Sequence, residues 1–195
     1  MHGRPPLPGH AAVPEASVQV FSYRSSEIDE SAAMTNDERW MESAIKEAEQ
    51  AYKRKEVPIG AVIVHESRII GRGYNQIESL QDPTAHAEII AITAAATSLG
   101  SRRLEDCTIY VTLEPCPMCA GAIVLARIPR LVFGAFDPKA GACGTLLNLV
   151  QDARFNHRVE LIPGIFEARC GALLTEFFKT VRNNGFGKPE TDSAG

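Results

Sequence analysis

Residues 107–127 read CTIYVTLEPCPMCAGAIVLAR and join a predicted strand directly to a predicted helix. The first seven of them are mainly β-branched or aromatic, which is typical of a buried strand. Pro117 opens the helix, where its missing N–H removes no hydrogen bond. Cys116 and Cys119 lie at this helix start, three residues apart in the sequence. Because α/β proteins place their chemistry where strands end and helices begin, we expect a functional site at this junction.

Strands and helices alternate on either side of this segment. An amphipathic helix is predicted at residues 36–55, behind Thr35 and Glu38, which have the spacing of a capping box. The remaining expected elements are strands at 59–65, 68–74, 131–135 and 159–162 and helices at 85–99, 145–152 and 166–182. This alternation opens with a hairpin and predicts one mixed sheet with helices on both faces.

The ends of the chain differ in composition from its middle. Residues 1–34 are rich in Pro, Gly, Ser and Ala without periodicity, so we expect a disordered extension there. Residues 35–186 form the predicted single domain, and residues 187–195 a loose tail. No apolar run approaches the roughly 18 residues of a membrane span, and the N-terminus lacks the apolar core of a secretory signal. We therefore expect a cytoplasmic protein that does not associate with membranes.

The charge of the chain indicates little by itself. The net charge is −4, which is not typical of a nucleic-acid binder. Residues 139–188 nevertheless contain seven basic side chains against four acidic ones. A basic stretch of this kind can meet a phosphate backbone, although solvated helix faces are its more common explanation.

The cysteines point to a metal. Their number is five, which is odd, and without a sign of secretion a disulfide framework is not expected. A second motif, Thr-Ala-His-Ala-Glu at residues 84–88, places His86 and Glu88 at another predicted helix start. Each part alone has an ordinary explanation: a structural zinc knuckle or redox pair, a hydrogen-bonded histidine, or an acidic residue in a first helical turn. In this order, however, H-x-E followed by P-C-x-x-C is the signature of the zinc nucleobase deaminases.

The donor types explain this signature chemically. Zinc favours imidazole and thiolate ligands, and His86, Cys116 and Cys119 supply three of them. We find no convincing fourth protein ligand in the sequence, which leaves a coordination position for water, as in catalytic sites. Glu88 can take a proton from that water and pass it to the ring and the departing amine, while the hydroxide attacks the amine-bearing carbon. The predicted enzyme is a hydrolytic deaminase that needs zinc and no nucleotide cofactor.

From about Thr35 to Arg182 the chain resembles the bacterial tRNA-specific adenosine deaminases, the TadA family of the cytidine/deoxycytidylate deaminase superfamily. The zinc motifs are common to the whole superfamily, and the other matching segments favour this branch. These segments are EVPIGAV at 56–62, YN at 74–75, DPTAHAEI at 82–89, VTLEPCPMCAGA at 111–122, VFGAFD at 132–137 and NHRV at 156–159. Phe136, Pro138 and Cys143 are not the residues expected in this family.

The resemblance implies a cytidine-deaminase-like three-layer α/β/α fold with a mixed sheet of about five strands, and a homodimer. It also implies a reaction: the wobble adenosine of a tRNA anticodon loop is converted to inosine by attack at C6 of the adenine. Since C6 is inaccessible in a stacked duplex, such enzymes take the base out of the stack.

The resemblance further implies substrate contacts. Asn75 would bind the flipped adenine, and Asp137, Asn156 and Phe178 would lie among the contacts to the anticodon loop. A turn Asn, an Asx turn before Pro138 and a core aromatic are the ordinary explanations of such residues. The core is the better explanation for Phe177.

Two alternatives stay open. A deaminase of free guanine or of cytosine-type bases or nucleotides would carry the same zinc motifs. Pro117 slightly favours it, because guanine deaminases also contain a P-C-P-M-C run. A noncatalytic RNA-binding subunit with a structural zinc is the other alternative, and it would be expected to lack a proton shuttle such as Glu88.

Overall fold

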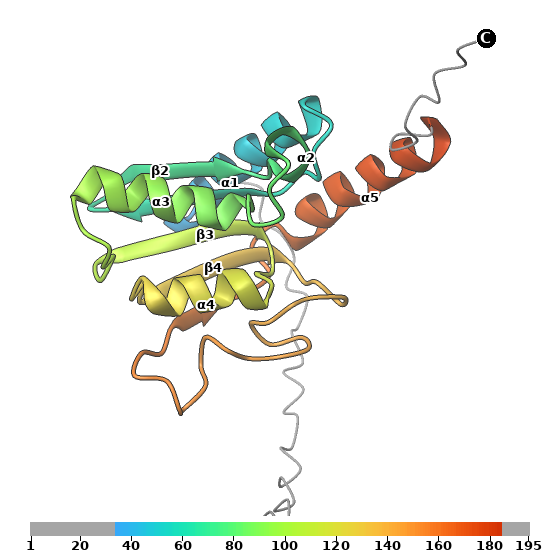
Figure 1. The fold of residues 1–195 in the computed structure, drawn as a ribbon. Helices are drawn as coiled ribbons and strands as arrows, with labels where there is room; N and C mark the ends of the chain where they lie inside the picture. The colour runs from blue at the N-terminus through green and yellow to red at the C-terminus, as the bar shows by residue number, and fades with distance from the viewer. Residues whose placement is uncertain (1–33, 185–195) are drawn as a thin grey trace, which may run out of the picture. The chain divides into compact units, whose positions relative to one another are not determined.

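Five strands form one sheet in the computed structural model, which describes residues 34–184 (Figure 1). They are β1 (Gly60–His65), β2 (Arg68–Tyr74), β3 (Cys107–Leu113), β4 (Arg130–Ala135) and β5 (Glu160–Ile162). Their order across the sheet is β2-β1-β3-β4-β5. β1 pairs antiparallel with β2 and β3, whereas β3, β4 and β5 run parallel, so the sheet is mixed as predicted.

Helices cover both faces of this sheet. α1 (Asn36–Lys53) and α5 (Glu167–Asn184) contribute to the apolar core on one face. α3 (Ala87–Leu99) and α4 (Pro117–Leu125) lie side by side on the other face, as Figure 1 shows. A short helix, α2 (Ile77–Leu80), connects β2 to α3. The predicted three-layer α/β/α arrangement is therefore confirmed.

The first turn of α1 is fixed to the sheet by polar contacts. Thr35 Oγ1 accepts a hydrogen bond from the Glu38 N–H (3.2 Å) and Glu38 Oε2 accepts one from the Thr35 N–H (2.7 Å), so the predicted capping box is present. The Asp37 carboxylate accepts two hydrogen bonds of 2.8 Å from Arg130 and one of 2.9 Å from the Tyr110 hydroxyl. Since Tyr110 is on β3 and Arg130 on β4, Asp37 ties the helix start to two strands.

Two glycines of β2 let α3 pack against the sheet at very short range. A Cβ atom at Gly73 would lie 2.2 Å from the carbonyl oxygen of Ala87, and one at Gly71 would lie 2.3 Å from that of Ala91. Ala87, Ala91 and Ala95 recur at helical spacing and form the buried face of α3. This close approach sets the position of the helix start beside the end of β2.

Four predicted helices differ from the structure at their ends. One of them, α5, spans Glu167–Asn184 rather than residues 166–182. α1 ends at Lys53 rather than at residue 55, because Lys55 adopts a left-handed conformation with φ 64°. α4 ends at Leu125 rather than at Arg127, whose φ is 61°. α3 begins at Ala87 rather than at residue 85. Left-handed helix ends usually carry glycine, and residues of other types give no sequence signal for them.

The helix predicted at 145–152 was wrong. This segment consists of turns and an isolated bridge between Cys143 and Asn148. The backbone N–H groups of Cys143 and Thr145 donate to the side chain of Glu114, which replaces helical hydrogen bonding at the start of the segment. α2 was not predicted, since four residues carry no periodicity. Apart from Met34, the extension predicted at 1–34 lies outside the described residues, as does the tail predicted at 187–195.

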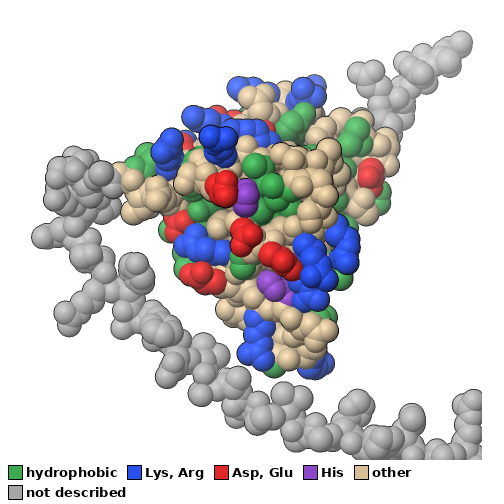
Figure 2. All heavy atoms as spheres, turned by 90° about the vertical axis from the view of Figure 1, so that its left-hand side faces the viewer, with side chains coloured by type: hydrophobic (Ala, Val, Ile, Leu, Met, Phe, Trp, Pro, Cys, Tyr) green, Lys and Arg blue, Asp and Glu red, His purple; other side chains and the backbone are tan. Residues whose placement is uncertain are grey.

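Charges of both signs are mixed on the end of the molecule that faces left in Figure 1. Figure 2 shows Lys and Arg side chains interspersed with Asp and Glu over this face. Within the basic stretch at 139–188, Arg154 forms an ion pair of 2.6 Å with Asp152 and Arg169 pairs with Glu42. These pairs favour the ordinary explanation of the basic stretch, which is a set of solvated helix faces.

None of the helices in residues 34–184 combines the length and apolar character that a bilayer crossing requires.

Candidate active site

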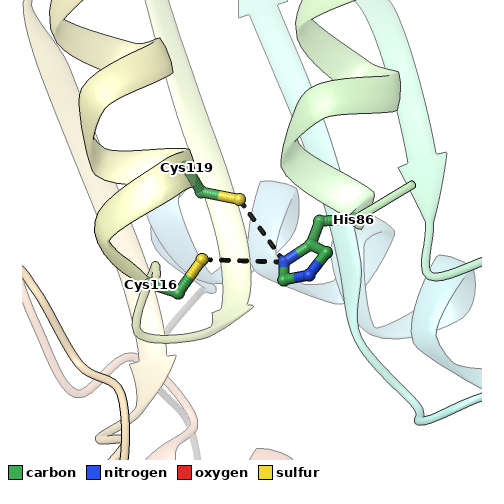
Figure 3. A group of neighbouring side chains, drawn as sticks. All are labelled: His86, Cys116 and Cys119. Atoms are coloured by element: carbon green, nitrogen blue, oxygen red, sulfur yellow. Dashed lines mark hydrogen bonds between the residues drawn. The ribbon is translucent and has the colours of Figure 1, made fainter. Parts of the chain in front are cut away.

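Two helix starts meet beside the carboxyl end of β3. His86 directly precedes α3, Cys116 directly precedes α4, and both have extended backbone conformations. The Nδ1 atom of His86 lies 3.7 Å from Sγ of Cys116 and 3.6 Å from Sγ of Cys119. Figure 3 shows both sulfur atoms directed at the same ring nitrogen. The structure thus brings together three side chains from two separate motifs.

The three donor atoms fit a bound cation. They lie within 4.8 Å of one another, and residues 34–184 contain no second group of this kind. Hydrogen bonds from Cys119 and His86 lower the pKa of Cys116 to about 4, and the neighbouring Cys116 sulfur in turn raises the pKa of Cys119. Cys116 is therefore a thiolate beside a Cys119 thiol that keeps its proton, and a cation bound between them would favour the thiolate form of both. One imidazole and two thiolates are a donor set that zinc prefers.

Glu88 lies next to this group, and one of its two carboxylate oxygens lacks a hydrogen-bond partner within the described residues. It is in the first turn of α3 and only 3% exposed, and its Oε2 atom has no hydrogen-bond partner within the described residues. Burial raises the pKa of its carboxyl group. Buried polar atoms are nearly always hydrogen-bonded, so an exception of this kind calls for an unseen partner or a chemical role.

Asn75 is close to the segment that carries His86. It directly follows β2 and is 2% exposed. Its backbone N–H donates to the Ile59 carbonyl (3.0 Å), and the N–H of the next residue, Gln76, donates to the carbonyl of Ala85 (3.0 Å). Ala85 is the residue before His86, so the end of β2 is fastened to the chain just ahead of this candidate ligand.

Asp137 lies in the loop after β4, and its side chain stabilises that loop. The carboxylate accepts hydrogen bonds from the backbone N–H groups of Lys139 (2.9 Å) and Ala140 (3.2 Å), which is the geometry of an Asx turn. β4 runs parallel to β3, and Ala135 pairs with Leu113. The loops that follow the two strands therefore leave the sheet at the same edge.

The two other predicted substrate residues are not part of the metal-binding group. Asn156 lines a cavity of about 260 Å³ together with Leu125 and Arg127, at the end of α4 opposite to Cys116. Phe178 lies on α5 and is 45% exposed. Its neighbour Phe177 is buried and packs against Tyr52 with ring centroids 5.8 Å apart, as expected for a core residue.

Sequence patterns gave no role to two buried carboxylates near the site. Glu56 and Glu114 are 1% and 2% exposed. Glu56 accepts hydrogen bonds from backbone N–H groups of α2, and Glu114 accepts them from the loop after β4. The sequence offered one signal for Glu114, which lies between a predicted buried strand and Pro115. A carboxylate at such a position is buried, and burial costs free energy unless the carboxylate is hydrogen-bonded.

The chain is similar to known deaminases over most of its described length. A family model described as MafB19-like deaminase matches residues 35–182. The tRNA-specific adenosine deaminase of Bacillus subtilis (strain 168) is 54% identical over 149 residues, which cover 76% of this chain and 92% of that protein. The tRNA-specific adenosine deaminase of Aquifex aeolicus (strain VF5) is 46% identical over 147 residues, which cover 75% of this chain and 97% of that protein.

Solved structures show the same likeness. One from a study of A-to-I editing by tRNA:A34 deaminases at the wobble position of transfer RNA has a TM-score of 0.67 and 45% identity, and the match covers 70% of this chain and 99% of that chain. A guanine deaminase from Nitrosomonas europaea has a TM-score of 0.64 and 22% identity, with 75% and 86% of the two chains covered. At that identity the second likeness concerns the fold alone.

Proposed function

Because the chain belongs to the family of tRNA-specific adenosine deaminases, we propose that it converts the wobble adenosine of a tRNA anticodon loop to inosine by zinc-dependent hydrolysis. One observation carries this proposal: His86, Cys116 and Cys119 converge beside the buried carboxylate of Glu88, whose Oε2 atom has no hydrogen-bond partner within the described residues. The named relatives support the choice of substrate, and the donor set supports the chemistry.

The proposed zinc ligands are Nδ1 of His86 and the sulfur atoms of Cys116 and Cys119. Zinc bound there would supply a Lewis acid that makes water a nucleophile at neutral pH. Cys116 stands at the start of α4, where the free N–H groups and the helix dipole stabilise a thiolate. With three protein ligands, the site keeps room for the reacting groups.

Glu88 is the proposed proton carrier. It takes one proton from the attacking water and gives it to the purine ring nitrogen. It then carries the second water proton, from the hydroxyl group now on C6, to the amine, which departs as ammonia and leaves a carbonyl at C6. A general acid–base group works best when its pKa lies near the working pH. Burial shifts the pKa of Glu88 upward, in that direction. The unpaired Oε2 atom is free to accept a hydrogen bond from water or base.

The remaining proposed contacts concern the RNA. Asn75, buried beside the His86 segment, would bind the adenine that leaves the stack of the anticodon loop. Asp137 and the exposed ring of Phe178 would contact the loop, since aromatic side chains stack on unpaired bases. Asn156 lies beyond the far end of α4, so its contact would be made in a homodimer, to RNA bound at the other protomer. The proposal includes this homodimer and a cytoplasmic location, where tRNA is found.

The experiment uses the zinc-loaded protein and a synthetic anticodon stem-loop that carries adenosine at the wobble position. We expect inosine at that position by mass spectrometry of the digested RNA, and none from a matched stem-loop whose adenosine lies within the paired stem. Free guanine is assayed in parallel for ammonia release. Ammonia from guanine together with unchanged RNA would refute the tRNA substrate and favour the free-base alternative.

A further inference from the structure

Glu114 is a buried carboxylate that the proposed reaction does not use. It directly follows β3, two residues before Cys116, and is 2% exposed. Its Oε1 atom accepts hydrogen bonds from the backbone N–H groups of Cys143 and Thr145, both 3.0 Å. Its Oε2 atom accepts one from the Asp137 N–H (3.1 Å) and one from the Thr145 hydroxyl. All four donors belong to one loop, residues 137–145.

The loop is folded tightly around this carboxylate. A Cβ atom at Gly141 would lie 2.3 Å from Oε2 of Glu114, so only glycine fits there without displacing the acid. The Gly141 N–H donates to the carbonyl of Asp137 (2.9 Å), which closes the turn within the loop. The hydrogen bonds to this carboxylate therefore hold together a segment that has no helix or strand of its own.

The same loop is fastened to the backbone just ahead of a predicted metal ligand. The Ala142 N–H donates to the carbonyl of Pro115 (2.9 Å), and the thiol of Cys143 lies 3.9 Å from the same oxygen. Pro115 is the residue before Cys116. Residues 137–145 are thus fastened beside Cys116, and below we call them the wall on that side of the candidate active site.

A second buried acid, Glu56, accepts hydrogen bonds from α2 in the same way as Glu114 accepts them from residues 137–145. Glu56 accepts hydrogen bonds from the backbone N–H groups of Glu78 (3.1 Å) and Ser79 (2.7 Å) and from the Ser79 hydroxyl (2.6 Å). These donors lie in and around α2, which follows Asn75. Both α2 and residues 137–145 are therefore held by a buried carboxylate, and the two acids provide controls for each other.

We propose that Glu114 is a positioning residue for the RNA substrate, which holds residues 137–145 in a single conformation beside Cys116 so that this wall is formed before the RNA binds. The inference rests on the proposed function for the identity of the substrate. A loop that is ordered only on binding adds the loss of its conformational entropy to the free energy of association. Loosening the loop therefore weakens binding of the RNA and leaves the chemical step largely intact.

The main test is Glu114→Gln in the full chain. The amide has one accepting oxygen in place of two and turns an N–H₂ group toward backbone donors. We expect the amides of Cys143 and Thr145 to exchange with deuterium about tenfold faster or more, as for the loss of a hydrogen bond to a charged group. KM for the stem-loop should rise about tenfold with kcat changed less than about threefold, and zinc content should stay at the wild-type level.

Two further variants keep the test decisive. Glu56→Gln should speed exchange at Glu78 and Ser79 and leave the amides of residues 137–145 unchanged. Thr145→Val removes one hydroxyl donor and keeps the carboxylate, so it should raise KM in the same direction by a smaller factor. This variant gives the answer if Glu114→Gln does not fold.

Some results would overturn the inference. If the backbone amides of residues 137–145 exchange with deuterium at the wild-type rate in both Glu114→Gln and Thr145→Val, Glu114 does not hold the loop. A fall in kcat at constant KM would show that the loop does not serve RNA binding. If the wild-type protein leaves the stem-loop unreacted, the proposed function fails and the RNA part of the inference fails with it, while the exchange rates still decide whether Glu114 positions the loop.

Discussion

The Nδ1 atom of His86 lies 3.6 Å from the Sγ atom of Cys119, although 33 residues separate them in the chain. Two packing relationships produce this proximity. The glycines of β2 admit α3 close to the sheet, which places His86 at the end of β2. Because β1 pairs antiparallel with both β2 and β3, these two strands run in the same direction, and the start of α4, with Cys116, lies at the same edge as the end of β2. The cluster is therefore a product of helix starts rather than of a flexible loop.

Replacing Glu88 separates metal binding from turnover. Glu88→Gln keeps the shape of the side chain and removes its ability to exchange a proton. We expect kcat on the stem-loop to fall roughly 10²–10⁴-fold, as for the loss of a general acid–base group. Zinc content, measured by elemental analysis, should equal that of the wild type, because Glu88 is not among the three converging donors. A variant that retains full activity would remove Glu88 from the mechanism.

The control for this substitution is Glu105→Gln. The Glu105 side chain is 57% exposed and pairs only with Arg103, which is 53% exposed. This variant should match the wild type in both activity and zinc content. Loss of activity in both variants would mean that the assay reports general damage to the protein.

Removing the metal should lower both activity and stability. Chelation removes the cation proposed to bridge His86, Cys116 and Cys119, and with it the bonds that join the starts of α3 and α4. Readdition of zinc at about 100 times its Kd should restore about 2.7 kcal/mol of unfolding free energy, seen as a higher Tm. His86→Ala should reduce zinc content, whereas His65→Ala, at the far end of β1, should not. Equal zinc in the two variants would exclude His86 as a ligand.

The convergence of the three candidate metal ligands could be expected from sequence because their information is local. Each lies in a short motif at a helix start, and helix starts are marked by residue types such as Pro117. Strand positions were predictable for a similar reason, since alternation and β-branched residues are local patterns. The mixed, five-stranded sheet followed from their order along the chain.

What could not be predicted depends on contacts between distant segments. The role of Glu114 becomes visible only when the loop that follows β4 folds back over the end of β3. The same contacts explain why residues 145–152 are not helical, although their apolar pattern allows a helix. The position of Asn156 likewise depends on the path of a long loop, and its sequence motif says nothing about that path.

Acid should remove the contribution of Asp37 to stability. The hydrogen bonds from Arg130, with that of Tyr110, hold the pKa of the Asp37 carboxyl below its usual value. A lowered folded-state pKa stabilises the fold above the unfolded pKa of about 3.9, and this stabilisation is lost as the pH falls through the folded value. Asp37→Asn should therefore reduce the free energy of unfolding at pH 7, by about 1–3 kcal/mol for charge-assisted hydrogen bonds.

The pH dependence distinguishes this effect from lost packing. Denaturant titrations of the wild type and Asp37→Asn should show a constant difference from pH 7 down to about pH 5 and a shrinking one below about pH 4. If the difference stays constant into strong acid, the ionised carboxylate is not its source. Glu105→Gln serves again as the reference, since an exposed pair contributes no more than about 1 kcal/mol.

Two adjacent aromatic residues on α5 should have different roles, one in the stability of the fold and the other in RNA binding. Phe177 is 9% exposed and packs edge-on against Tyr52, whereas Phe178 is 45% exposed, with its ring centroid 5.5 Å from that of Phe177. Phe177→Ala should destabilise the fold by about 3–5 kcal/mol, as for truncation of a core aromatic. Phe178→Ala should leave stability within about 1 kcal/mol and raise KM for the stem-loop, because a lost base stack weakens binding by about 1–3 kcal/mol. The measurements are Tm and steady-state kinetics on each variant. If Phe178→Ala binds and turns over the stem-loop like the wild type, the exposed ring does not contact the RNA, and the outer face of α5 has to be removed from the proposed substrate surface.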